Sequence, residues 1–255
     1  MKKLILSILF IICLSFQAKA WNPMVVVSGS GASAIACLDE TYTIAWTGDL
    51  ADMNDACDSS KEKVDGTNVN LPIGTDYGES GAVGVQIADV DEYLAWTNVG
   101  MIDVSTPQTI WCKIYISAAP DVETIIFEAW DTTNNEGICI NIMTDGRTIG
   151  VWEDGGDYET MANNNTGNAE WKYIAYSFDI GNTKHSVYDS GSVGTTEWDE
   201  EVEGINVLTA DPDNILIGTN GSPASRTTGD PGAGKYINIE KCAVVNGYQA
   251  ANPLD

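Results

Sequence analysis

Two indoles and several polar side chains recur in the middle of the chain at positions where they could contact a sugar. Trp130 and Trp152 each lie near the end of an alternating apolar segment, and Glu128, Asn141 and Asp154 lie at neighbouring polar positions. An indole can stack on the C–H face of a pyranose while amides and carboxylates bind its hydroxyls. These five residues are therefore candidate ligand-binding residues. The alternative is that the indoles pack beneath loops or a second sheet.

The two indoles are expected to share one face of a sheet. Alternation assigns Ile149 and Val151 to the core and leaves Trp152 on the opposite side, together with Trp130. If their strands flank a middle strand that carries Asn141, the indoles lie about 10 Å apart, two strand spacings.

Alternating carboxylates offer a different chemistry, that of a glycoside hydrolase. Glu197, Asp199 and Glu201 are two residues apart and would point the same way on a strand. A retaining glycosidase needs two carboxylates about 5 Å apart. However, Glu200 would then face the core without a partner, which is costly. A solvated acidic loop is the simpler interpretation, so the sequence leaves an enzymatic role open and favours a non-catalytic one.

Acidic clusters also make calcium a candidate cofactor, because Ca²⁺ binds carboxylate, amide and carbonyl oxygens. The main cluster is Asp211, Asp213 and Asn214, before an apolar segment. Further clusters are Glu153, Asp154 and Asp157, and Asp89 with Asp91. Chance clustering is the alternative in so acidic a chain.

The charge balance excludes nucleic acid as a partner. The 255 residues carry 12 Lys and Arg against 37 Asp and Glu, a formal net charge of −25. Phosphate binding needs a basic face, and here the carboxylates outnumber the cations by about three to one. The hydrophobic fraction of 44% and charged fraction of 19% are typical of a protein with a buried core.

Residues 1–20 have the pattern of a cleaved signal peptide. Lys2 and Lys3 precede an apolar run, and Ala18-Lys19-Ala20 resembles a cleavage site. The run is too short to span a bilayer. We therefore expect a secreted, cell-surface or periplasmic protein that is not inserted in a membrane after cleavage.

The rest of the chain predicts an all-β fold. Short alternating segments are separated by Gly, Asp and Asn turns, and no helix-length amphipathic window intervenes, which is typical of a β-sandwich or barrel. The expected strands are 82–88, 93–96, 109–117, 124–130, 138–143, 148–152, 171–180, 185–189, 214–218 and 236–245. We expect one domain over 21–255, in which 21–79 is an irregular N-terminal part.

The order of these segments resembles a known superfamily. The matching pieces are GAVGVQIADVDEYLAW, QTIWCKIYIS, ICINIMTDGRTIGVW, EWKYIAYSFD, HSVYDSG, NILIG and YINIEKCAVVNGYQAANPL. In this order, over about residues 80–254, they resemble the laminin-G-like and pentraxin-like branch of the concanavalin A-like lectins and glucanases. The resemblance implies a two-sheet antiparallel jelly roll, and a module that binds glycans, proteins or calcium more often than it catalyses a reaction.

The resemblance also bears on the cysteines. Five remain after residue 20, an odd number, so one thiol stays free or pairs with another molecule. Cys112 lies where pentraxins have the first half of a disulfide, but the position expected for its partner carries alanine. We favour Cys112 with Cys242 on the closing strand, and Cys37 with Cys57, which leaves Cys139 over. The alternative is that all five are small buried hydrophobes.

Three functions follow as hypotheses. The favoured one is an exported, non-catalytic carbohydrate-binding or adhesion module whose partner is a polysaccharide or glycoconjugate, with calcium as a possible aid. The second is a glycoside hydrolase that uses Glu197, Asp199 and Glu201. The third is a structural protein of the cell surface or of an extracellular assembly. The oligomeric state does not follow from the sequence.

Overall fold

A computed structural model describes most of the chain beyond residue 66 and three short strands before it. The chain divides into two compact units, Met1–Ser30 and Gly31–Asp255, and all described residues belong to the second. They are residues 42–47, 52–53, 64–65, 67–89, 92–98, 100, 102–154, 157–163, 165–192, 198–202, 208–218 and 231–254. The expected signal peptide and the expected Cys37–Cys57 pair lie outside them.

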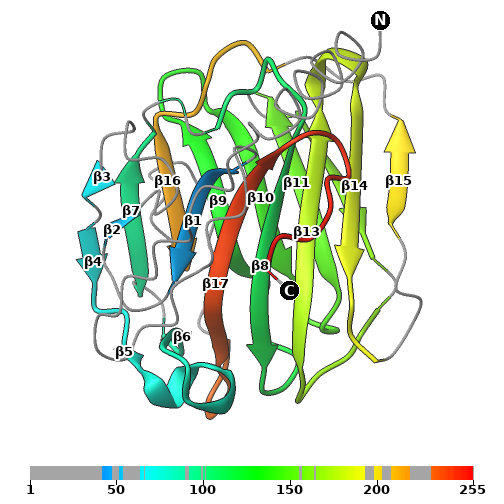
Figure 1. Ribbon diagram of the computed structural model, residues 1–255. Helices are drawn as coiled ribbons and strands as arrows, with labels where there is room; N and C mark the ends of the chain where they lie inside the picture. Colours follow the sequence, from blue (N-terminus) through cyan, green and yellow to red (C-terminus); the bar gives the residue numbers. More distant parts are fainter. Residues whose placement is uncertain are drawn as a thin grey trace, which may run out of the picture. The chain divides into compact units, whose positions relative to one another are not determined.

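Two antiparallel sheets make up the second unit (Figure 1). The eight-stranded sheet has the order β15 (Asp199–Val202), β14 (Lys184–Asp189), β13 (Trp171–Asp179), β8 (Gln108–Ile116), β17 (Ile237–Asn246), β6 (Gly84–Ile87) and β5 (Ile73–Gly74), with β1 (Tyr42–Thr47) also paired to β17. The seven-stranded sheet has the order β12 (Asp157–Ala162), β11 (Thr148–Asp154), β10 (Glu136–Ile142), β9 (Thr124–Asp131), β16 (Asn214–Gly218), β7 (Tyr93–Thr97) and β4 (Thr67–Val69). The predicted all-β, two-sheet antiparallel sandwich is confirmed.

The remaining described elements are short. β2 (Asp52–Met53) and β3 (Val64–Asp65) form a separate ribbon, and η2 (Thr75–Tyr77), η3 (Glu79–Gly81) and η4 (Ile180–Asn182) are single 3₁₀ turns. Within the described ranges, no helix has the length and apolar character needed to cross a bilayer.

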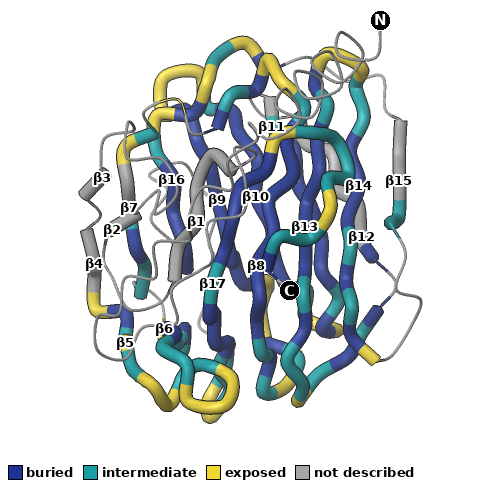
Figure 2. The backbone as a smooth tube through the Cα atoms, in the orientation of Figure 1, coloured by how far each residue is buried: buried dark blue, intermediate teal, exposed yellow. Residues whose placement is uncertain are grey.

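The core lies between the two sheets and follows from the alternation of each strand. Along β8, Ile110, Cys112, Ile114 and Ile116 point inward and are fully buried. They belong to one cluster with inward residues of the other sheet, including Phe127, Ile138, Ile140 and Trp152. Figure 2 shows the central strands of both sheets in dark blue. Burying each such side chain contributes on the order of 2 kcal/mol.

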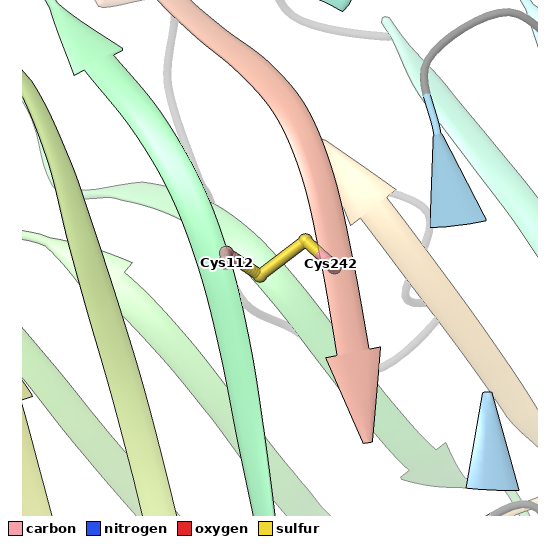
Figure 3. Close-up of a disulfide and its surroundings, with 2 residues drawn as sticks. All are labelled: Cys112 and Cys242. Carbon is pink, nitrogen blue, oxygen red and sulfur yellow. A yellow bond between two sulfur atoms is a disulfide. The ribbon is translucent and has the colours of Figure 1, made fainter. Parts of the chain in front are cut away.

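A disulfide joins two neighbouring strands of the eight-stranded sheet. Cys112 on β8 is the register partner of Cys242 on β17, and their sulfur atoms are bonded (Figure 3). The bond connects residues 130 apart in sequence, so it ties the closing strand of the chain to the middle of the fold. The pairing expected from the sequence is present. Cys139, expected to be left over, is buried in the other sheet.

A buried ion pair lies within the eight-stranded sheet, and its carboxylate also accepts a hydrogen bond from the opposite sheet. Lys172 Nζ on β13 lies 2.7 Å from Asp189 Oδ2 on β14, and neither side chain is exposed to solvent. Thr148, at the start of β11 in the opposite sheet, donates its hydroxyl to the same oxygen at 2.6 Å. The backbone N–H of Gly191 donates to Asp189 Oδ1 at 2.9 Å. Asp189 is thus a single acceptor for groups from both layers of the sandwich.

Substituting Lys172→Met should test this connection. The substitution leaves the Asp189 carboxylate buried without its cation, which we expect to lower the free energy of unfolding by about 3–5 kcal/mol in urea titration. The matched control is Lys235→Met, because Lys235 pairs with Asp121, whose side chain is 63% exposed. That variant should change the free energy by at most about 1 kcal/mol. Equal, small effects of both substitutions would contradict a structural role for the buried pair.

Candidate functional site

Trp130 and Trp152 do not share a face, which corrects the expectation from the sequence. On β10, Gly137 pairs with Trp130 and the next residue, Ile138, pairs with Trp152. Successive residues of a strand point to opposite sides, so the two indoles do too. Trp152 is 1% exposed and belongs to the core cluster.

The reason lies in Gly150. It faces inward, where a Cβ would overlap the ring of Tyr176 on the opposite sheet. Strand β11 therefore turns Gly150 and Trp152 toward the core. Ile149 and Val151, which the sequence assigned to the core, form a small outer cluster with Cys139 instead. A bulky aromatic ring across the sandwich decides the phase of this strand.

The other proposed ligand-binding residues lie on the outer side of the seven-stranded sheet and are buried. Glu128 and Asn141 are each 1% exposed, and Trp130 is 2% exposed. The amide of Asn141 donates to the carboxylate of Glu123. The side chain of Asp154 lies outside the described part of the chain. A role of these residues in ligand binding stays a prediction.

The acidic segment proposed for catalysis is described only in part. Asp199 begins β15, the edge strand of the eight-stranded sheet. The sequence favours a solvated loop at this position. Glu201 occupies the register position opposite His185. Glu197 lies outside the described residues. His185, the single histidine, is fully buried, with its Nδ1 3.0 Å from the hydroxyl of Tyr176.

The residues proposed for calcium hold loops together. Asp211 Oδ1 accepts the backbone N–H of Val104 at 3.0 Å. Asp213 Oδ2 accepts the hydroxyl of Thr132 at 2.9 Å, and Asn214 opens β16. Among the described residues no group of three or more His, Cys, Asp or Glu side chains is placed to hold a metal ion. Of the remaining predicted acids, Asp89 and Glu153 are described, whereas Asp91 and the side chain of Asp157 are not. Calcium stays a prediction.

A site that the sequence reasoning did not single out lies on the outer face of the eight-stranded sheet. Four side chains form one row across four adjacent strands. Gln86 on β6 pairs with Asn238 on β17, Asn238 pairs with Tyr115 on β8, and Tyr115 pairs with Trp171 on β13. Figure 1 shows these strands side by side. Gln86, Tyr115 and Trp171 are half-buried, and Asn238 is 6% exposed.

A third ring extends the aromatic part of the row. The ring centroids of Tyr115 and Trp171 are 5.7 Å apart, and Tyr236, just before β17, stacks on Tyr115 at 6.1 Å. The two amides of the row are joined, because Gln86 Nε2 donates to Asn238 Oδ1 at 3.1 Å. We call Gln86, Tyr115, Trp171, Tyr236 and Asn238 the aromatic–amide site.

A lysine held by two carboxylates lies beside this site. Lys113 Nζ is 2.6 Å from Glu79 Oε2 and 3.1 Å from Glu240 Oε1. It also lies 5.6 Å from the ring centroid of Trp171 and 5.9 Å from that of Tyr173. Burial alone would lower the pKa of Lys113, but the hydrogen bonds to Glu79 and Glu240 outweigh it and raise the pKa above its ordinary value. The lysine is therefore charged at neutral pH.

The other half of this face is covered by the C-terminal segment. Trp111 Nε1 donates to the carbonyl of Ala250 at 3.1 Å, and Leu254 is buried against Trp111 in the same cluster. The hydroxyl of Tyr173 donates to the carbonyl of Leu254 at 3.2 Å. Figure 1 shows this segment, in red, crossing in front of β13. The aromatic–amide site thus lies beside the part of this face that the C-terminal segment covers.

Comparison with known proteins establishes the fold. The chain matches no family model and no curated protein. Among solved structures it is similar to the binding domain of Paraclostridial Mosquitocidal Protein 1, with a TM-score of 0.58 and 10% identity over 84% of this chain and 50% of that one. It is similar to the botulinum neurotoxin serotype D binding domain, with a TM-score of 0.58 and 10% identity over 82% and 49%. It is also similar to the binding domain of botulinum neurotoxin DC in complex with SialylT, with a TM-score of 0.59 and 9% identity over 81% and 48%.

The fold is a two-sheet antiparallel β-sandwich shared with those binding domains. At such identity the likeness carries the fold alone, and this chain spans about half the length of those chains. The ligands named for those proteins are theirs. Any ligand of this chain must be argued from its own residues.

Two tryptophan substitutions should distinguish the core from the site. Trp152→Ala removes a buried indole, so we expect it to lower the free energy of unfolding by about 3–5 kcal/mol. Trp171→Ala removes a half-buried ring with one aromatic neighbour and one cation–π contact, so about 1 kcal/mol is expected. Urea titration of both variants measures the difference. If Trp171→Ala proves as costly as Trp152→Ala, the site belongs to the core.

Proposed function

We propose that the chain is an exported, non-catalytic carbohydrate-binding module and that it binds its ligand at the aromatic–amide site. The observation that carries this proposal is the row itself, in which two amides and two rings lie at one level across four strands. Aromatic rings bind the C–H surface of a sugar, and amides bind its hydroxyls. Both kinds of group belong to rigid strands, which fixes their spacing before a ligand arrives.

The dimensions of the row suit an oligosaccharide. Four strands give three spacings, so the row is about 14 Å long. Within the amide pair, one donor and one acceptor bind each other. Beyond that bond, the pair carries N–H groups on both amides as donors and the carbonyl oxygen of Gln86 as an acceptor. A sugar hydroxyl both donates and accepts, so it complements this pair.

One of the similar structures supports carbohydrate binding by this fold. It holds SialylT, which indicates that a domain containing this fold can serve glycan recognition. Membership of the laminin-G-like or pentraxin-like branch is a finer proposal, and it rests on the order of the sequence segments. Export rests on the pattern of residues 1–20. Calcium assistance rests on Asp211, Asp213 and Asn214, and the experiment below includes it as an arm.

Affinity electrophoresis against a panel of polysaccharides should test the proposal on the chain after residue 20. We expect the wild type to be retarded by at least one polymer. Trp171→Ala and Tyr115→Ala should each weaken that binding at least fivefold, since each stacked ring contributes about 1 kcal/mol or more. Running the gels with calcium and with a chelator measures any metal dependence.

The matched control is Tyr248→Ala. Like Trp171, Tyr248 is half-buried beside a lysine, in this case Lys184. Lys184 pairs with Asp179, the last residue of β13, whereas Trp171 is the first, so Tyr248 lies near the opposite end of that strand from the site. This variant should bind as the wild type does. Absence of binding to every polymer class would overturn the proposed function. Undiminished binding by Trp171→Ala would overturn the assignment of the site.

A further inference from the structure

The charged groups around the aromatic–amide site are already paired. Lys113 is bound by Glu79 and Glu240, and Lys241 lies 3.9 Å from the same Glu240 carboxylate. The backbone N–H of Glu79 donates to Glu240 Oε2 at 2.9 Å, which holds the loop of η3 against the sheet. Two ammonium groups and two carboxylates thus balance each other beside the row of rings and amides.

An anionic ligand would have to break this arrangement. To reach Lys113, a ligand carboxylate must displace Glu79 or Glu240. Glu240 is 8% exposed, so displacing it leaves a nearly buried carboxylate without its cation, which is strongly unfavourable. Displacing Glu79 separates its carboxylate from Lys113 and adds a third negative charge beside Glu79 and Glu240. The net charge of −25 adds long-range repulsion of anionic polymers.

A cationic ligand would have to displace Lys113 from its two carboxylates. Both carboxylates beside the site are bound to Lys113, and a ligand amine would compete with an ammonium that also contacts the rings of Trp171 and Tyr173. Breaking those contacts costs the cation–π attraction as well as the ion pairs. An uncharged hydroxyl needs no such exchange, because the donor and acceptor of the Asn238–Gln86 pair suit it as they stand.

We infer that the aromatic–amide site selects uncharged, hydroxyl-rich glycans over glycans that carry carboxylates or amines. This inference rests on the proposed function and specifies its ligand class. Glu79 has a particular part in the selection, because it is the more exposed carboxylate, 46% against 10% for the side chain of Glu240. It occupies the position at Lys113 that the carboxylate of an acidic sugar would otherwise take.

Matched polymers separate the ligand classes. The probes are hydroxyethyl cellulose, carboxymethyl cellulose and an aminated cellulose, which share one backbone, with a parallel uncharged and carboxymethylated set on a mixed-linkage glucan. We expect binding to an uncharged member that changes less than twofold between about 50 and about 500 mM NaCl, because no ion pair with the ligand is screened. The charged derivative of the same backbone should bind at least tenfold more weakly.

A substitution at Glu79 provides the second readout. Glu79→Gln removes the exposed carboxylate from Lys113, so the ratio of carboxymethylated to uncharged binding should rise at least threefold. The matched control is Asp145→Asn, because Asp145 pairs with Arg147 in a turn of the other sheet. That variant should leave the ratio unchanged.

The outcomes separate the two claims. Tighter binding to the carboxymethylated or aminated polymer, strong salt dependence, or a ratio that Glu79→Gln does not raise would overturn the inference while leaving a carbohydrate-binding module in place. Failure to bind any member, charged or uncharged, would overturn the inference, and absence of binding to every polymer class of the panel would overturn the proposed function with it.

Discussion

Strand β8 is hydrogen-bonded on both sides, by β13 and by β17, and this leaves its side chains only two directions to point. Inward residues such as Cys112 and Ile114 build the core, and Cys112 meets its disulfide partner at the same register level. Outward residues of the same strand, Lys113 and Tyr115, have no place in the core. Such outward side chains can be covered by another segment, paired with opposite charges, or left accessible to a ligand. Each of these cases occurs at a different point along the outer face.

Along the outer face, Trp111 is covered, Lys113 is paired, and Tyr115 belongs to the half-buried row. The C-terminal segment covers Trp111 through a hydrogen bond from its indole and the packing of Leu254. Two carboxylates pair with Lys113. The contrast with Trp130, which is 2% exposed on the other sheet, is the reason for placing the ligand at the row. The rings of the row are half-buried and belong to rigid strands, so a ligand can reach them without rearranging the sheet.

Much of this fold could be predicted from local pattern. Alternation located the strands, and the position of Cys112 in a recognisable order of segments led to its pairing with Cys242. The phase of β11 could not be predicted in this way, because Ile149 and Val151 are the more hydrophobic alternative to Gly150 and Trp152. The choice depends on Tyr176, which reaches Gly150 from the opposite sheet. No local pattern contains that information.

The aromatic–amide site escaped prediction for a related reason. The outward positions of Tyr115 and Trp171 follow from alternation within their own strands. The row exists only because those strands pair at particular registers with β17 and β6, which bring together residues 86, 115, 171 and 238. Register between segments so distant in sequence is set by the whole core, including the buried Lys172–Asp189 pair one residue beyond Trp171.

The most direct test of the central claim is to follow the indole N–H signals of the tryptophans by NMR while an uncharged oligosaccharide is added. A Trp171→Phe variant assigns the signal of Trp171. The account predicts that this signal shifts progressively and saturates, while the signals of Trp130 and Trp152 stay in place. A saturating shift of Trp130, with Trp171 unmoved, would show that the ligand binds the other sheet and would contradict the account.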